Sequence, residues 1–145
     1  MRVLFLCTGN SCRSQMAEGW ARAIAAKLPV RNQFEFASAG LEAHGLNPRA
    51  VAVMAENGID ITSQTSDVLT DAMLAEADLV ISVCAHADER CPLLPTGTAR
   101  RHMPFDDPAV ATGEESDIKA CFQNVCERIR VEVEILVHEL AAKEL

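Results

Sequence analysis

The 145-residue chain contains no tyrosine, only one tryptophan and no apolar run near the ~20 residues that a membrane-spanning helix needs. Positive charge is also scarce, because 13 Lys and Arg residues face 21 Asp and Glu residues and leave a net charge of −8. This balance argues against nucleic acid and against an anionic membrane as partners, since both are bound through Lys and Arg. It does not exclude a small anion, because an acidic protein can still contain a local positive pocket.

The composition is that of one globular domain. Hydrophobic residues make up 49% and charged residues 23%, which excludes a disordered chain, and the length predicts a single domain over residues 1–145. The N-terminal apolar stretch is too short for a signal peptide, so we expect a cytoplasmic protein. We also expect a monomer. The six cysteines are then expected to stay reduced, and none of their spacings fits a structural zinc site.

Strand and helix patterns alternate along the chain. Runs of apolar and β-branched residues predict strands at 2–6, 79–83 and 101–105, and a further strand that starts at 34 and ends within 38–40. Apolar residues at helical spacing, with Asn47 and Thr70 as N-caps and Gly58 at a helix end, predict helices over 13–28, 48–57, 71–76 and 116–145. This alternation predicts a parallel sheet with helices on both faces.

Reactive residues follow three of the predicted strands. The first strand ends at Cys7, the third at Cys84, and the fourth just before Asp106 and Asp107. Ligands of parallel α/β sheets bind at the carboxyl ends of the strands, so these residues are expected at one edge.

The segment CTGNSCRS from Cys7 to Ser14 joins the first strand to the first helix. Backbone N–H groups of such a turn form an oxyanion nest, with Gly9 supplying backbone freedom and Asn10 tolerating a left-handed conformation. Arg13 is suited to bind the oxyanion with two parallel N–H groups. The predicted oxyanion-binding residues are Thr8, Gly9, Asn10, Ser11, Cys12, Arg13 and Ser14.

Cys7 lies at the base of this nest, where the positive surroundings favour a thiolate and the Ser14 hydroxyl can donate to the sulfur. The competing interpretation is a free cysteine at a strand end, followed by a capped helix. Cys12 lies inside the loop, and we expect its side chain to pack rather than react. We likewise expect Cys121 and Cys126 to fill the core beside the last helix.

The segment CTGNSCRSQMAEGW resembles the loop of the low-molecular-weight protein tyrosine phosphatase superfamily, and more closely its thioredoxin-coupled arsenate reductase branch. The likeness continues in SAG at 38–40, HGLNP at 44–48, TSD at 65–67, Cys84, Cys91 and FDDP at 105–108. It implies an α/β three-layer sandwich with a four-stranded parallel sheet. It also implies that Cys7 forms an adduct with arsenate, Cys84 attacks it and releases arsenite, and Cys91 closes a disulfide that thioredoxin reduces.

Without the first loop, Cys84 and Cys91 are equally well explained as a buried strand-end cysteine and a filler residue. With a nucleophilic Cys7 at the same sheet edge, we expect a relay in which each thiol must reach the previous sulfur, within a segment expected to be polar and exposed. If residues 84–91 are helical, seven steps of ~1.5 Å place the two Cα atoms roughly 10 Å apart. A disulfide tolerates at most about 7 Å, so we expect this segment to rearrange on oxidation.

Asp107 directly precedes Pro108, and by residue type alone a loop-initiating turn explains this pair better than an acid does. The resemblance implies that Asp107 is the general acid that protonates the departing oxygen. Ala109 and Val110 stand where phosphatases of the family typically carry aromatic residues. Together with the absence of tyrosine, this favours a small inorganic substrate.

Some family reductases bind potassium near the loop, at positions that correspond to Asn10, Glu18, Ser38 and Asp67. Hydrogen bonds that brace the loop are an equal alternative for these residues. No organic cofactor is expected, because the cysteines supply both electrons. The predicted function is arsenate reduction with thioredoxin as the electron donor, although mycothiol and glutathione serve related enzymes. The alternatives are a phosphatase, whose activity is also expected as a weak side reaction, and an oxyanion-binding or redox-sensing module without turnover.

Overall fold

The computed structural model describes residues 1–91 and 94–144, and its centre is a four-stranded parallel sheet with the order β2–β1–β3–β4. The strands are β1 (Arg2–Cys7), β2 (Glu35–Gly40), β3 (Leu79–Ser82) and β4 (Ala99–His102). The α-helices are α1 (Arg13–Ala25), α2 (Pro48–Glu56), α3 (Asp71–Glu76), α4 (Ala85–Glu89) and α5 (Glu115–Glu144). Two short 3-10 helices, η1 (Arg31–Gln33) and η2 (Pro108–Val110), complete the elements. The predicted fold class is confirmed.

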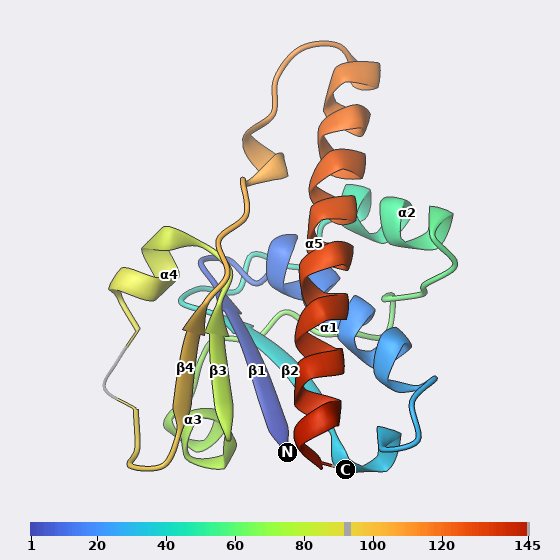
Figure 1. Ribbon diagram of the computed structural model, residues 1–145. Coiled ribbons are helices and arrows are strands. Elements are labelled where there is room, and N and C mark those ends of the chain that lie inside the picture. The colour runs from blue at the N-terminus through green and yellow to red at the C-terminus, as the bar shows by residue number, and fades with distance from the viewer. Residues whose placement is uncertain (92–93, 145) are drawn as a thin grey trace.

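The helices cover both faces of the sheet, as Figure 1 shows. α1 and α5 pack side by side on one face, whereas α3 and α4 lie on the other. The loop after β1, helix α4 and the segment after β4 all gather where the strands end. This common edge is where the sequence predicted the reactive residues to meet.

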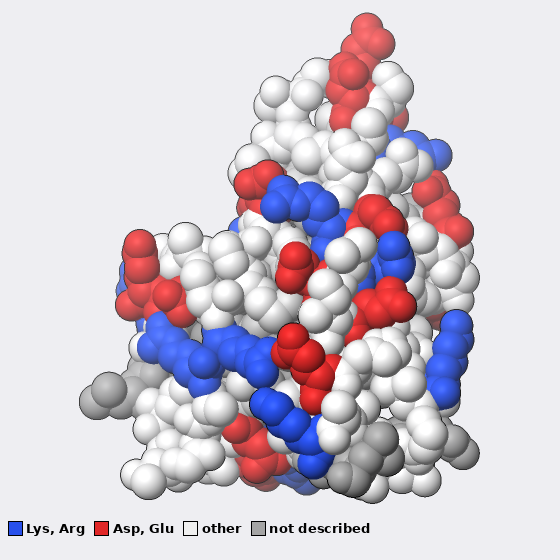
Figure 2. Space-filling view, in the orientation of Figure 1, with Lys and Arg blue, Asp and Glu red and all other residues white. Residues whose placement is uncertain are grey.

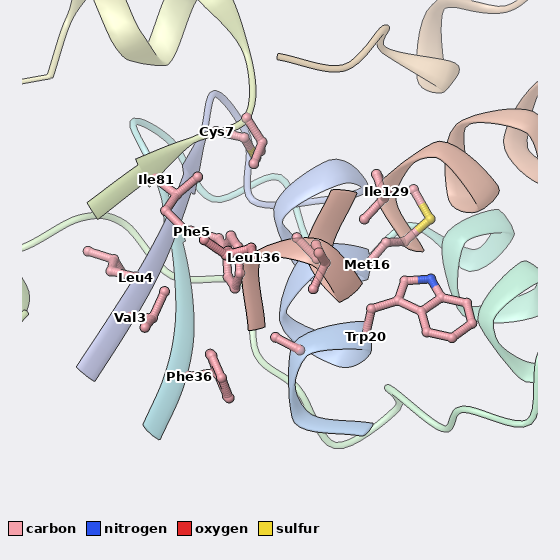
Figure 3. Packing of buried hydrophobic residues seen from close by; sticks show 14 of the residues in the cluster. Val3, Leu4, Phe5, Cys7, Met16, Trp20, Phe36, Ile81, Ile129 and Leu136 are labelled. Carbon is pink, nitrogen blue, oxygen red and sulfur yellow. The ribbon is translucent and has the colours of Figure 1, made fainter. Parts of the chain in front are cut away.

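The inner position of β1 in the sheet suits its apolar sequence. Its residues from Val3 to Cys7 are all buried, because strands flank it on both sides and helices cover both its faces. Met16 and Trp20 on α1 pack with Ile129 on α5 in the same cluster (Figure 3). The core therefore extends along β1 to the residue at which the reactive loop begins.

The predicted helix starts are confirmed at two caps. The Asn47 side chain accepts a hydrogen bond from the Arg49 N–H at 2.8 Å, and the Thr70 hydroxyl accepts one from the Met73 N–H at 3.2 Å. Gly58, just past α2, has the positive φ of 77° that a helix-ending glycine adopts.

Two element boundaries differ from the sequence prediction by more than one residue, and helix α4 was not predicted as an element. β4 spans 99–102 rather than 101–105, because its polar residues pair with β3 at the sheet edge and apolar patterning does not mark such a strand. β2 ends at Gly40, as the sequence predicted, and stays paired with β1 as far as Cys7. α1 ends at Ala25 instead of 28, because the chain tightens to i→i+3 hydrogen bonds at Lys27 and Leu28 before Pro29. Within residues 1–91 and 94–144, no helix is long and apolar enough to cross a membrane.

The buried face of α5 predicts a large difference between two isoleucines on that helix. Ile129 is fully buried whereas Ile135 is 53% exposed. We expect Ile129→Ala to lower the free energy of unfolding by about 2–5 kcal/mol through the lost apolar contacts and the cavity. Ile135→Ala, the matched control, is expected to change it by less than about 0.5 kcal/mol. Urea denaturation measures both, and equal effects would contradict this account of the core.

Candidate active site

The loop from Thr8 to Cys12 is held in place by hydrogen bonds that its carbonyl groups accept from the segment 41–47. The carbonyls of Cys7, Thr8, Gly9 and Ser11 accept hydrogen bonds from the N–H groups of Leu41, Glu42, His44 and Asn47, at 2.9 to 3.1 Å. In a planar trans peptide the carbonyl and the N–H point in opposite directions. The N–H groups of these same peptides therefore face inward, which is the arrangement that an oxyanion nest requires.

Two glycines, Gly9 and Gly40, lie where the loop and the segment around 40–47 come close together. A Cβ on Gly40 would lie 2.3 Å from the Glu42 carbonyl oxygen and 2.7 Å from the Asn10 nitrogen, which are both backbone atoms. A Cβ on Gly9 would lie 2.4 Å from Nδ1 of His44. Gly9 is absent from the positive-φ residues of the described chain, so the predicted backbone freedom is not used there, and its nearest neighbour is the His44 side chain.

Asn10 adopts the left-handed conformation that the sequence predicted, with a φ of 47°. Its fully buried side chain donates from Nδ2 to the hydroxyls of Ser14, at 2.8 Å, and Ser38, at 2.9 Å. The Ser14 hydroxyl in turn lies 2.8 Å from the Cys7 Sγ. Since the Asn10 amide proton occupies the Ser14 oxygen, the Ser14 proton is available to the Cys7 sulfur.

Arg13 opens α1, and its guanidinium points back over the loop toward the segment after β4. Nη1 donates to the Phe105 carbonyl at 3.2 Å, and Nη2 lies 3.5 Å from Oδ2 of Asp107. Asp107 has the extended backbone expected before proline, with φ −82° and ψ 108°. Its other oxygen accepts from the Ala109 N–H at 3.0 Å, so Asp107 also caps η2, as the turn interpretation expected.

Cys84 lies next to the loop from Thr8 to Cys12, which we call the anion loop. Its Sγ is 3.3 Å from Oγ1 of Thr8, the residue that directly follows Cys7. The same sulfur accepts from the Ala87 N–H at 3.3 Å and so caps α4. Cys84 is only 3% exposed, which contradicts the prediction of an exposed segment at this cysteine.

Cys91 follows α4 and is half-buried. Burial raises the pKa of its thiol and Asp88 adds to this shift, whereas the positive charge of Arg100 opposes it. Helix α4 lies between Cys84 and Cys91, so the helical geometry that the sequence analysis considered is the one present.

The remaining cysteines have other surroundings. Burial raises the pKa of Cys12 to about 12, with the Asp107 charge adding to the effect, so Cys12 stays a neutral thiol at physiological pH. Cys126 is buried, and its Sγ accepts from the Trp20 indole N–H at 3.4 Å, as expected for a core residue. Cys121 is only half-buried on α5, so the predicted core role fits it less well.

The four positions predicted for potassium lie together beside the loop. Asn10 donates to Ser38, the Ser38 hydroxyl donates to Oε1 of Glu18 at 2.7 Å, and the Asp67 N–H donates to Oδ1 of Asn10 at 2.8 Å. Burial raises the pKa of Glu18 and the Asp67 charge adds to it, whereas the Ser38 hydrogen bond and Arg22 oppose it. Hard oxygen ligands beside two carboxylates suit a monovalent cation, so the residues fit. The bracing hydrogen bonds of the alternative are present as well.

The sequence analysis missed one fully buried support of the loop. Gln15 is fully buried, and its Nε2 donates to the Asn10 carbonyl at 3.1 Å and to the Thr65 carbonyl at 2.8 Å. Gln64 donates to Oε1 of Gln15 at 2.8 Å. A polar residue within the apolar pattern of the first helix was the available signal, because a buried amide must find hydrogen-bond partners.

The close approach at Gly40 predicts a loss of anion binding when a methyl group is added there. In Gly40→Ala the new Cβ displaces loop backbone that no side-chain movement can relieve. We expect phosphate affinity, measured by calorimetry, to fall at least about tenfold. Gly97→Ala is the control, because Gly97 has a φ of 93° and open space around its Cα. It should lose about 1–2 kcal/mol of stability and keep its phosphate affinity. Equal affinities in the two variants would refute this role for Gly40.

Comparisons with known proteins agree with this geometry. The family model described as low molecular weight phosphotyrosine protein phosphatase matches residues 2–145. The chain is 52% identical to an arsenate reductase of Bacillus licheniformis over 127 residues, 88% of each chain, and 51% identical to one of Bacillus subtilis over the same shares. An arsenate reductase of Staphylococcus aureus is 44% identical over 132 residues, 91% of this chain and 92% of its own length.

Solved structures lead to the same group of proteins. An arsenate reductase in the phosphate-binding state superposes with a TM-score of 0.75 at 32% identity, covering 95% of this chain and 97% of its own. A low molecular weight protein tyrosine phosphatase from T. tengcongensis reaches a TM-score of 0.79 at 26% identity, with 96% and 99% covered. On this evidence, the chain belongs to the low molecular weight phosphotyrosine protein phosphatase family.

Proposed function

We propose that this protein reduces arsenate to arsenite through Cys7, Cys84 and Cys91, with thioredoxin restoring the dithiol. The observation that carries the proposal is the Cys84 Sγ, 3.3 Å from the hydroxyl of Thr8 in the anion loop. Ester hydrolysis has no use for a second thiol there, whereas reduction of a bound oxyanion needs two electrons from a nearby sulfur. Relatives of 44–52% identity that are named arsenate reductase support the same activity.

The surroundings of the acid support a small substrate. Ala109 and Val110 follow the Asp107-Pro108 pair, and Val110 is 73% exposed. Neither side chain supplies the aromatic surface that would bind the ring of a phosphotyrosine. A tetrahedral oxyanion needs only the loop N–H groups and the guanidinium of Arg13.

In the first step, the Cys7 thiolate attacks the arsenic of arsenate bound in the loop, and a sulfur–arsenic bond forms as one oxygen leaves as water. The inward N–H groups and Arg13 stabilise the added negative charge. Asp107, whose Oδ2 lies 3.5 Å from Arg13, supplies the proton to the departing oxygen.

In the second step, the Cys84 thiolate attacks the Cys7 sulfur, and the electron pair of the sulfur–arsenic bond passes to arsenic, which leaves as arsenite. The Thr8 hydroxyl, when it donates to Cys84, favours the thiolate needed for this attack. Cys91 then attacks Cys84, which forms the 84–91 disulfide and releases Cys7 as a thiolate. We propose that α4 unwinds in this step, and that the thioredoxin dithiol then reduces the exposed disulfide.

We further propose that potassium binds beside the loop through the oxygens of Asn10, Glu18, Ser38 and Asp67. A cation there offsets the charges of the Glu18 and Asp67 carboxylates. The Asp67 charge contributes to the raised pKa of Glu18. Its contribution would be to hold the Asn10–Ser14 side of the loop in place. It takes no part in the sulfur chemistry.

The relay predicts that single cysteine replacements separate two activities. Cys84→Ser and Cys91→Ser should each lower thioredoxin-coupled arsenate turnover, followed by NADPH oxidation, by more than about 100-fold. Any hydrolysis of a chromogenic phosphate ester should survive in both, because Cys7, Arg13 and Asp107 remain.

Cys121→Ser is the matched control, since Cys121 lies on α5 and has no part in the relay. It should keep both activities. Arsenate turnover that persists in Cys84→Ser would contradict the reductase proposal, and ester hydrolysis alone in the unaltered protein would favour a phosphatase. Oxyanion binding without either activity would favour a non-enzymatic module.

The potassium proposal predicts a pH-dependent stabilisation. Excess potassium chloride should raise the melting temperature by about 3 °C over the same concentration of tetramethylammonium chloride at neutral pH. Because the cation binds ionised Glu18, whose pKa is raised, the gain should disappear as the pH falls through that pKa. Glu18→Gln should abolish the gain at all pH values. An equal gain in this variant would mean that potassium acts elsewhere.

A further inference from the structure

Helix α4, which separates Cys84 from Cys91, is only five residues long and is tied down at both ends. At its start the Cys84 sulfur accepts the Ala87 N–H. Near its end, Asp88 connects it to the two neighbouring strands. Figure 2 shows Lys and Arg side chains over β4, next to acidic side chains over α4.

Asp88 is the centre of this second attachment. Its Oδ1 accepts from the Ser82 hydroxyl on β3 at 2.8 Å and from Nη2 of Arg100 on β4 at 2.9 Å. The same Arg100 nitrogen donates to the Asp88 backbone carbonyl, within the last turn of α4. Nδ1 of His102 lies 2.9 Å from the Ser82 oxygen and 3.8 Å from Oδ1 of Asp88. The Arg100 and Ser82 hydrogen bonds lower the pKa of Asp88, so the carboxylate is the form that these contacts hold.

We propose that Asp88, Ser82 and Arg100 form a latch that holds α4 in its helical, dithiol form, and that opening this latch controls the reactivity of the Cys84–Cys91 pair. This inference rests on the proposed relay. A helix between the two cysteines keeps their Cα atoms roughly 10 Å apart, beyond the ~7 Å limit of a disulfide. Closing the disulfide therefore requires α4 to unwind, and unwinding carries Asp88 away from β3 and β4.

Arg100 connects the latch to the last thiol of the relay. Its positive charge lowers the pKa of Cys91, while the Asp88 carboxylate raises it. The largest cause of the raised pKa of Cys91 is burial, and the latch preserves the folded α4 in which Cys91 is half-buried.

The latch contributes to the dithiol form alone, which sets the direction of the expected effect. In a redox buffer, oxidised dithiothreitol takes two electrons from the Cys84–Cys91 dithiol, so that a protein disulfide and reduced dithiothreitol form. A variant that weakens the latch destabilises the dithiol and leaves the disulfide unchanged. Its equilibrium constant for oxidation must rise, and its reduction potential must become more negative.

The test measures this equilibrium constant at neutral pH by quantifying the 84–91 disulfide with mass spectrometry after acid quenching. Asp88→Asn should raise the constant about fivefold, or about 20 mV in reduction potential, as expected for a charge-assisted contact with partial exposure. Arg100→Gln should raise the constant similarly, whereas Arg100→Lys should raise it less, because a positive charge remains. In the Asp88→Asn/Arg100→Gln double variant the effect should stay close to that of one single variant, because both remove the same interaction.

Glu139→Gln is the matched control. It neutralises the carboxylate that pairs with Arg101, the neighbour of Arg100 on β4, at 3.1 Å, and it does not touch α4. This variant should keep the equilibrium constant of the unaltered protein. An unchanged or lower constant in both Asp88→Asn and Arg100→Gln would overturn the latch, as would multiplicative effects in the double variant. Failure to form any 84–91 disulfide in the unaltered protein would instead overturn the relay itself.

Discussion

The outward hydrogen bonding of the loop carbonyls is the interaction on which the rest of the site depends. The N–H groups of residues 41–47 take up the carbonyls of Cys7, Thr8, Gly9 and Ser11, and each peptide thereby turns its own N–H inward. Parallel pairing of β2 with β1 as far as Cys7 and Gly40 brings this segment into place. The proposed oxyanion site is thus built from backbone geometry, which a chain with a net charge of −8 can supply.

Polar burial beside the loop follows the same logic. Asn10, Ser14, Gln15, Glu18 and Ser38 are all nearly or fully buried, and no buried side-chain nitrogen or oxygen in the described residues lacks a hydrogen-bond partner. A fully satisfied polar network of this kind specifies one geometry, because any shift leaves a desolvated group unpaired. The rigid half of the site is therefore the half that supports Cys7 and contains the proposed oxyanion loop.

The opposite side of the site is built differently. Cys84 and Asp88 hold α4 through a few contacts, several of them partly exposed, and a five-residue helix has little stability of its own. A relay through three thiols needs such an element, since rigid placement would keep the second and third sulfurs apart. The contrast between a fixed anion loop and a releasable α4 is what the proposed reduction requires beyond ester hydrolysis.

The amino-acid sequence determined the order of the strands and of every α-helix except α4, the helix caps at Asn47 and Thr70, and the left-handed turn at Asn10, because these depend on local patterns and backbone preferences. It also indicated that Cys7, Cys84 and Asp107 follow strand ends. Only the tertiary structure decided that Gln15 braces the loop, that Gly40 is needed for close approach, and that Asp88 ties α4 to Ser82 and Arg100. Each of these contacts joins residues from different elements, and periodicity within one element carries no information about which element will pack against it.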